Sequence, residues 1–176
     1  MKILDVCCGS RMFWFDRENH RTIFLDNRHE YHSLKDKSSK GGFRDLIIKP
    51  DIQADFKTLP FKDNSFLMVV FDPPHYINAG EKGWLAKKYG VLKKSWQEDL
   101  RKGFSECFRV LQKNGTLVFK WSEYQIPTSK VLALIPEKPL FGNVRSKLAK
   151  SHWLVFMKHN KHINADTRIE PLVSVM

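Results

Sequence analysis

The 176-residue sequence predicts a single α/β domain, with a mostly parallel seven-stranded sheet, an antiparallel edge hairpin and helices on both faces. Two observations lead to this prediction. Short runs rich in β-branched and aromatic residues recur along the chain, and segments with helical spacing of apolar residues lie between several of them. Strands that alternate with helices are typical of parallel sheets, because each crossover lays a helix on the sheet.

Seven runs are expected to form strands because they are short, apolar and rich in β-branched or aromatic residues. The last two are separated by a short link, which suits an antiparallel hairpin at the sheet edge. The expected strands are residues 2–6, 21–26, 51–55, 66–71, 115–121, 138–144 and 152–158.

The clearest helix is expected over residues 95–115, where apolar side chains recur every three or four positions. Ser95 and Glu98 have the spacing of a capping box, and Asn114-Gly115 is a typical helix end. Two further helices are expected, one over residues 10–18 and one from about residue 127 to before Pro136. The polar, glycine-rich stretch 35–42 is expected to be a mobile loop.

The sequence is read as one domain over residues 1–158 with a loosely held tail over residues 159–176. No apolar run is long enough to span a membrane, and the N-terminus does not resemble a secretory signal, so a cytoplasmic protein is expected. Three cysteines, Cys7, Cys8 and Cys107, suit neither a disulfide framework nor a zinc site, and no metal is expected.

The net charge of +11 and the isoelectric point near 9.6 favour a polyanionic partner. Nucleic acid or an anionic membrane face would satisfy this balance, and a merely soluble basic protein is the plain alternative. We expect nucleic acid as the partner, with DNA favoured over RNA, and no membrane.

Acids stand at or near the ends of four successive expected strands: Asp5, Asp26, Asp55 and Asp72. Ligands of open α/β sheets bind at the carboxyl ends of the strands. Solubility alone does not require so regular a placement, so these acids indicate a ligand site.

The turn after the first strand reads "DVCCGS", in which Gly9 lets the backbone pass close to a ligand. Neither GxGxxG nor GxxxxGK[ST] occurs, which disfavours a dinucleotide or a nucleoside triphosphate. Asp26 follows about twenty residues after this turn, where a carboxylate accepts both ribose hydroxyls. S-adenosylmethionine fits, because it has a ribose and no phosphates.

The segment "ILDVCCGS", Asp26 and the motif "DPPHY" together resemble the class I S-adenosylmethionine-dependent methyltransferases, over about residues 2–158. More narrowly, they resemble small phage-type or orphan DNA adenine amino-methyltransferases. The resemblance implies a Rossmann-like fold and S-adenosylmethionine as cofactor. It implies that the methionine end is bound by Asp5, Cys7 and Gly9, the ribose by Asp26, the adenine by Asp55 and Phe56, and the methyl end beside Asp72.

The DPPH motif matches the needs of amine methylation. An exocyclic amine is a poor nucleophile because its lone pair is delocalised into the base. Fixed acceptors stabilise the positive charge that develops as the methyl group arrives. Asp72 and the carbonyl of Pro73 would be these acceptors, Pro74 would stiffen the loop, and His75 would stack on the base.

The expected substrate-binding residues are His75, Tyr76, Trp84, Lys87, Lys88 and Trp121. The fifth expected strand ends at "FKWSE", so Lys120, Trp121 and Glu123 should lie beside the pocket. A base in a duplex must be turned out of the stack to reach such a site. Residues 82–94 hold five lysines and no acid, with two aromatic rings among them, which suits backbone charge and base stacking. A second basic segment, residues 138–165, holds six Lys or Arg residues and no acid.

Other readings stay open at this level. The base could be cytosine, the nucleic acid could be RNA, or the substrate could be a protein glutamine amide, although the basic charge disfavours the last. A catalytically silent DNA-binding domain is the non-enzymatic alternative, and a homodimer is a further option.

Overall fold

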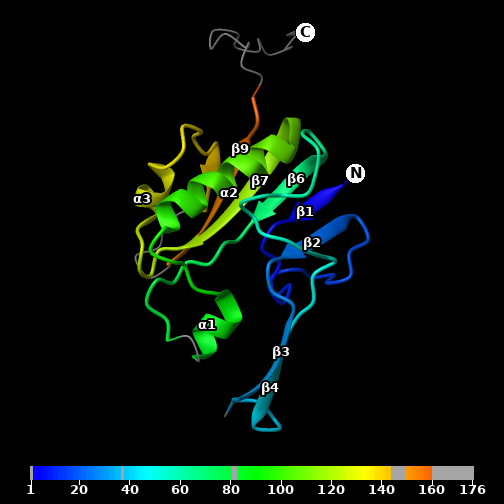
Figure 1. Cartoon of the computed structure of the whole chain (residues 1–176), viewed down its shortest axis with the longest axis vertical. Helices are drawn as coiled ribbons and strands as arrows, with labels where there is room; N and C mark the ends of the chain where they lie inside the picture. Colours follow the sequence, from blue (N-terminus) through cyan, green and yellow to red (C-terminus); the bar gives the residue numbers. More distant parts are fainter. Residues whose placement is uncertain (1, 37, 81–82, 144–149, 160–176) are drawn as a thin grey trace, which may run out of the picture.

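The computed structural model describes residues 2–36, 38–80, 83–143 and 150–159. Its main sheet has seven strands in the order β5-β2-β1-β6-β7-β9-β8 (Figure 1). The strands are β1 (Ile3–Asp5), β2 (Thr22–Asp26), β5 (Ile52–Gln53), β6 (Phe66–Phe71), β7 (Leu111–Ser122), β8 (Phe141–Gly142) and β9 (Ser151–Met157).

The sheet is parallel from β5 to β7 and antiparallel at its far edge. β1 pairs in parallel with β2 and β6, β2 with β5, and β6 with β7, whereas β9 runs antiparallel to both β7 and β8. This arrangement confirms the predicted mostly parallel, seven-stranded sheet with an antiparallel edge. The expected strands at 51–55 and 138–144 form only two-residue strands.

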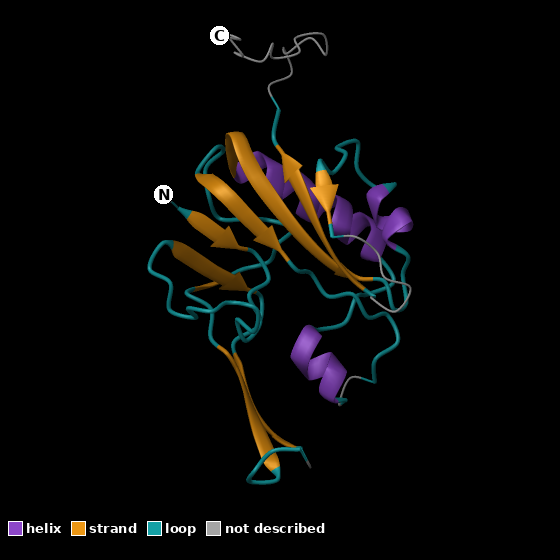
Figure 2. Cartoon of the chain, turned by 180° about the vertical axis from the view of Figure 1, so that it is seen from behind, coloured by secondary structure: helices purple, strands orange, loops and turns teal. Residues whose placement is uncertain are grey.

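Helices α2 (Trp96–Val110) and α3 (Thr128–Leu132) lie against one face of the sheet (Figure 2). Aromatic side chains fill the interface between α2 and the central strands. The ring of Phe104 on α2 lies 5.3 Å from that of Phe71, 4.8 Å from that of Phe119 and 6.2 Å from that of Phe156. Because side chains alternate along a strand, the neighbouring residues point to the opposite face.

On that opposite face, residues 10–18 form turns, and the helix predicted there is wrong. Tertiary contacts outweigh the local helical spacing. Trp14 donates a hydrogen bond from its Nε1 to Asp5 on β1, at 2.7 Å, and packs edge-on against Phe24 of β2. Arg11 has a φ of 53°, which a helix excludes, and its guanidinium binds the Asp51 carboxylate at 3.0 Å.

The long helix was predicted in the correct place, but its ends differ. Ser95 forms no side-chain cap, because its Oγ donates to Asp99 Oδ2 at 2.9 Å, so the predicted capping box is not made. The helix ends at Val110 rather than at Asn114, and β7 begins at the next residue. Residues that would have formed the last helical turn therefore belong to the sheet.

Two elements were not predicted. β3 (Glu30–Lys35) and β4 (Phe43–Ile48) form a separate antiparallel hairpin. Of the stretch expected to be a loop, 35–42, only Lys35 belongs to a strand, and the rest lies between the two strands. α1 (Trp84–Tyr89) forms within the lysine-rich segment. Figures 1 and 2 show the hairpin and α1 projecting from the same side of the molecule.

Among the described residues, no helix has both the length and the apolar character that crossing a membrane requires. The predicted tail at 159–176 lies outside the described residues except for its first position. Much of the second basic segment, including Arg145 and Lys147, is also outside them.

Candidate cofactor and active site

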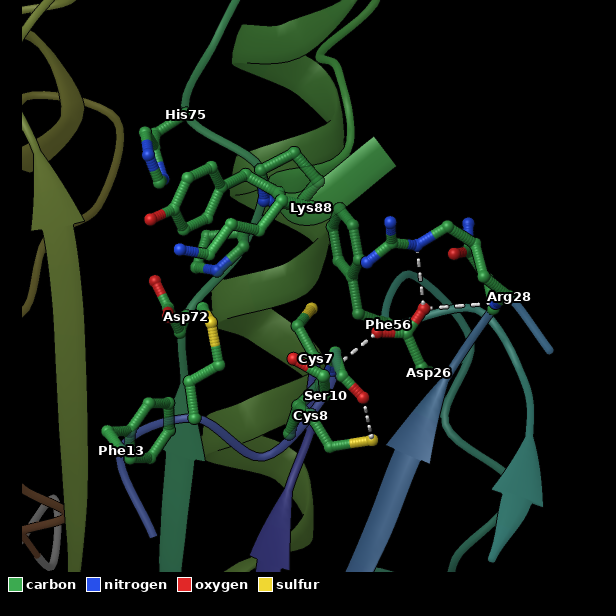
Figure 3. A pocket seen from close by; sticks show the side chains of 17 residues that line it. Cys7, Cys8, Ser10, Phe13, Asp26, Arg28, Phe56, Asp72, His75 and Lys88 are labelled. Carbon is green, nitrogen blue, oxygen red and sulfur yellow. Dashed lines mark hydrogen bonds and ion pairs between the residues drawn. The ribbon is translucent and has the colours of Figure 1, made fainter. Parts of the chain in front are cut away.

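A cavity lies at the carboxyl ends of β1, β2 and β6 (Figure 3). We call it the main cavity. The first turn, the β2 end, the DPPH loop and α1 all contribute to its wall. Its lining residues are Val6, Cys7, Cys8, Gly9, Ser10, Met12, Phe13, Asp26, Asn27, Arg28, Phe56, Asp72, Pro73, Pro74, His75, Lys88 and Tyr89.

The first turn is fastened to the end of β2. Gly9 has a φ of 50°, in the left-handed region that favours glycine, and its N–H donates to Asp26 Oδ2 at 2.9 Å. The other oxygen of Asp26 accepts from the backbone N–H of Arg28 at 3.0 Å and from its Nε at 3.2 Å. A carboxylate has about four lone-pair positions, so these three donors leave room for about one more.

Arg28 also connects the end of β2 to α1. Its Nη1 donates to the backbone carbonyl of Lys87 at 2.8 Å, while its Nε stays on Asp26. Gly90, which ends α1, lies directly against Pro74 of the DPPH loop: a Cβ added at Gly90 would lie 3.0 Å from Pro74 Cγ. The short helix is therefore held over the cavity by a side chain and by a close backbone contact.

Asp72 follows β6 and points into the main cavity (Figure 3). Its Oδ2 forms a 2.6 Å ion pair with Lys120 Nζ of β7. Its buried Oδ1 accepts no hydrogen bond from any residue that the structure describes. Burial raises the pKa of Asp72, and the positive charge of Lys120 partly opposes this shift. One oxygen is thus paired with a cation, and the other is a buried acceptor without a donor among the described residues.

His75 lies within a group of rings at the far side of the cavity. Its ring centroid is 4.6 Å from that of Tyr76 and 5.2 Å from that of Tyr89, and Trp121 lies edge-on at 6.1 Å. Only 3% of His75 is exposed. Burial, followed by the nearby charge of Lys120, lowers the pKa of His75 to about 4, so the ring is neutral at pH 7.

A second cavity adjoins the main one, and we call it the side cavity. Met12, Phe13, His75 and Tyr89 line both. The side cavity is completed by Tyr76, Lys120, Ser122 and Ser151. The ion pair of Asp72 and Lys120 lies where the two cavities meet, because the acid lines one and the lysine lines the other.

Several predicted site residues are brought together here. The main cavity is lined by Cys7, Gly9, Asp26, Phe56, Asp72, Pro73, Pro74, His75 and Lys88, and the side cavity adds Tyr76. Burial raises the pKa of the Cys7 thiol well above its usual value, so the thiol is neutral. Among the described residues, no three His, Cys, Asp or Glu side chains gather as a metal site requires.

Other predicted residues lie elsewhere. Asp5 is fully buried behind the first turn and bonded to Trp14, so it does not line the cavity. The Asp55 carboxylate accepts a hydrogen bond from the backbone N–H of Lys57 at 2.9 Å, and Asp55 does not line the cavity.

Trp121 is also fully buried, and its Nε1 donates to the carbonyl of Ile126 at 2.9 Å, so it supports His75 from behind and offers no face to a substrate. Trp84 and Lys87 lie on α1 outside both cavities.

Lys120, which was expected beside the pocket, lines the side cavity, and Tyr89, an aromatic residue of the expected substrate-contact segment, lines both cavities. The sequence did not indicate Arg28 as a site residue, because only the folded chain brings it next to α1.

No family model matches the chain, and no curated protein matches it. Several solved structures do. The PH0226 protein of Pyrococcus horikoshii aligns with a TM-score of 0.54 and 15% identity, over 89% of this chain and 81% of its own. A SAM-dependent methyltransferase of Methanosarcina mazei aligns with a TM-score of 0.51 and 12% identity, over 90% and 92% of the two chains.

A SAM-dependent methyltransferase of Leishmania major aligns with a TM-score of 0.50 and 14% identity, over 89% of this chain and 64% of its own. Identities this low establish the fold and nothing finer. The sheet order and these alignments together show that the chain has the Rossmann-like fold of SAM-dependent methyltransferases.

Proposed function

We propose that this protein is an S-adenosylmethionine-dependent methyltransferase that methylates an exocyclic amino group of a nucleobase, with adenine in DNA as the leading substrate. The observation that supports this most directly is the free, buried Oδ1 of Asp72 at the junction of two cavities. Such an oxygen is costly to bury without a donor, so its place suits a substrate that brings one.

The main cavity fits S-adenosylmethionine chemically. Asp26 keeps about one lone-pair position for a ribose hydroxyl, and it can accept a second if the Nε of Arg28 moves away. Phe56 offers an apolar surface to the adenine, and Gly9 leaves the first turn free of a side chain at the methionine end. Two of the similar structures are described as SAM-dependent methyltransferases, which supports the same cofactor here.

When bound, S-adenosylmethionine supplies the methyl group: its S–CH₃ bond breaks as an N–CH₃ bond forms, and the sulfonium becomes a neutral thioether. Asp72 Oδ1 accepts a hydrogen bond from the substrate amine and stabilises the positive charge that develops on the nitrogen. The amine then loses one proton, for which the Asp72 carboxylate is the nearest base. His75, being neutral, serves as a flat wall.

The charge distribution supports a nucleic acid. α1 and the residues after it carry Lys87, Lys88, Lys93 and Lys94 with no acid from residue 83 to 97, and this segment borders the main cavity. A protein glutamine amide would use the same acceptor, but it needs no such row of cations. We therefore place nucleic acid, and DNA before RNA, ahead of protein.

The test is a methyl-transfer assay with a labelled donor and a panel of single-stranded DNA, double-stranded DNA, RNA and protein. Each product is digested and the modified monomer identified by mass. We expect label on the amino group of adenine, with cytosine as the second outcome. Label only in protein, or no transfer together with no heat of S-adenosylmethionine binding in calorimetry, would contradict the proposal.

A further inference from the structure

The side cavity is built to hold a flat ring. The three rings of His75, Tyr76 and Tyr89 lie within 4.6–5.8 Å of one another, and all three line it. Aromatic side chains stack on any base, so these rings give position and affinity without distinguishing one base from another. Discrimination has to come from polar groups at the edge of the ring.

Lys120 provides one such group. Its ammonium has three N–H donors, and within the described part of the chain its only hydrogen-bond acceptor is Asp72 Oδ2, at 2.6 Å. The ammonium also lies 5.8 Å from the ring centroids of Phe13 and Trp153, which supply no acceptor in the plane of the ring. Donors of Lys120 therefore remain for a molecule in the side cavity.

Asp72 provides the complementary group, because its Oδ1 is an acceptor without a donor. The ion pair fixes the two groups next to each other, so the substrate meets an acceptor and a donor side by side. The matching edge has an N–H donor on one atom and a lone pair on the adjacent one. Adenine has this edge at its amino group and N1, and cytosine has it at its amino group and N3.

Guanine does not match on its Watson–Crick edge. Its amino group lies between two ring nitrogens: N1 carries a hydrogen, which would face the ammonium of Lys120, whereas N3 has a lone pair but lies beside the glycosidic bond. A buried donor left without a partner costs more than a weakened contact does, so binding of guanine through its N1 side is disfavoured.

We propose that Lys120 donates a hydrogen bond to the unprotonated ring nitrogen beside the methylated amine, and so selects the Watson–Crick edges of adenine and cytosine over that of guanine. This inference rests on the proposed function and adds a specificity-determining residue to it. Lys120 thereby has two roles: it orients Asp72 through one donor and binds the ring of the substrate through another.

The test compares two single-stranded DNA oligonucleotides that differ in one atom group. One carries the base that the wild-type protein methylates; the other carries its deaza analogue, 1-deazaadenine or 3-deazacytosine, in which C–H replaces the ring nitrogen. For the wild-type protein we expect kcat/KM to be about 10- to 100-fold lower on the analogue, the usual effect of losing a hydrogen bond to a charged group. Equal values on the two oligonucleotides would overturn the inference.

The Lys120→Met variant keeps an unbranched side chain but has no donor. We expect its kcat/KM to be equal on the natural base and on the analogue, and no higher than the wild-type value on the analogue, because Asp72 also loses its partner. Because Lys120 opposes the rise in the pKa of Asp72, the acid limb of its pH–rate profile should also move to higher pH. Calorimetry with S-adenosylmethionine verifies that the variant is folded.

Lys130→Met is the matched control, since Lys130 is an exposed lysine on α3 outside both cavities. We expect it to discriminate between the oligonucleotides as wild type does. A Lys120→Met protein that still discriminates would overturn the role of Lys120. A wild-type protein that methylates no nucleobase would overturn the proposed function as well, whereas equal rates on the two oligonucleotides would overturn only this inference.

Discussion

Two buried carboxylates, Asp5 and Asp72, lie at the ends of adjacent strands, yet their surroundings differ. Asp72 has a cation 2.6 Å away, whereas Asp5 has the neutral indole N–H of Trp14 at 2.7 Å. Burial raises the pKa of Asp5 to about 7, and the Trp14 hydrogen bond only partly opposes the shift. Asp72, which lines the main cavity, is paired with a cation, whereas Asp5, which lies behind it, is about half protonated at pH 7.

This difference predicts how stability depends on pH. Folded Asp5 keeps its proton up to about pH 7, whereas the unfolded chain releases it near pH 3.8, so the folded state loses stability as pH rises between these values. We expect Asp5→Asn, which cannot ionise, to gain on the order of 3 kcal/mol relative to wild type between pH 4 and pH 8. Urea unfolding at both pH values measures this gain, and parallel curves for the two proteins would contradict it.

Asp72→Ala is expected to abolish methyl transfer, because the substrate amine loses its acceptor, while affinity for S-adenosylmethionine stays within a few-fold of wild type. Initial rates with labelled donor and calorimetry measure the two effects. Asp63→Ala is the control, since Asp63 is an exposed acid before the other end of the same strand. Normal turnover by Asp72→Ala would contradict the assignment.

At the level of residues, the sequence could predict the parts of the cavity whose position follows from strand ends. Gly9, Asp26 and Asp72 each stand at or beside the carboxyl end of a recognisable strand, and all three line the main cavity. Arg28 could not be found in this way, because its position depends on the distance between β2 and α1 in the folded chain. Asp55 does not line the main cavity, and its carboxylate accepts a local hydrogen bond from the backbone N–H of Lys57.

Among the elements, α1 combines charge with a fixed position. Its basic side chains lie next to the main cavity, and its last turn is fastened to Arg28 and packed on Pro74. A six-residue helix is too short to be stable alone, so these contacts keep it in place.

We expect neutralisation of Lys87, Lys88, Lys93 and Lys94 to glutamine to weaken nucleic-acid binding and to flatten its dependence on salt, because fewer counterions are released from the phosphates. Fluorescence anisotropy with a labelled oligonucleotide at several salt concentrations measures the slope. A matched control neutralises four exposed lysines elsewhere: Lys62, Lys102, Lys113 and Lys130. An unchanged slope in the α1 variant would move the binding face to another part of the molecule.

Periodicity predicted the elements whose burial is one-sided and continuous, as in α2 and β6. It failed at residues 10–18, where the helical spacing of Arg11, Trp14 and their neighbours is overridden by contacts with residues far along the chain. It also missed the β3–β4 hairpin, whose outward face exposes Tyr31, Phe43 and Ile47 and so lacks the alternation of a half-buried strand.

For the whole molecule, the hairpin and α1 project on the same side (Figure 1), and α1 contributes Lys88 and Tyr89 to the main cavity. The hairpin begins four residues after Asp26, at the carboxyl end of β2. Its register pairs Ser33 with Asp45, so the residues beyond this pair, 34–44, can be replaced by a turn without changing the pairing of the rest.

We expect a variant in which Asn-Gly replaces residues 34–44 to keep the fold and the affinity for S-adenosylmethionine, because a two-residue turn joins an antiparallel pair well. The replaced segment contains four basic residues and one acid, so affinity for nucleic acid should fall. Circular dichroism, calorimetry and anisotropy measure the three properties. Unchanged anisotropy would exclude the hairpin from the interface, and loss of the fold would show that its tip is structural.

Arg28 connects the proposed cofactor site to the basic helix α1, because it binds both Asp26 and the Lys87 carbonyl. A ribose bound at Asp26, as proposed, would share that carboxylate with the guanidinium of Arg28, which also binds the Lys87 carbonyl of α1. Binding at Asp26 would thereby be coupled to the position of α1, and such coupling between two binding sites is reciprocal. If S-adenosylmethionine changes the affinity of the protein for nucleic acid by some factor, nucleic acid must change the affinity for S-adenosylmethionine by the same factor.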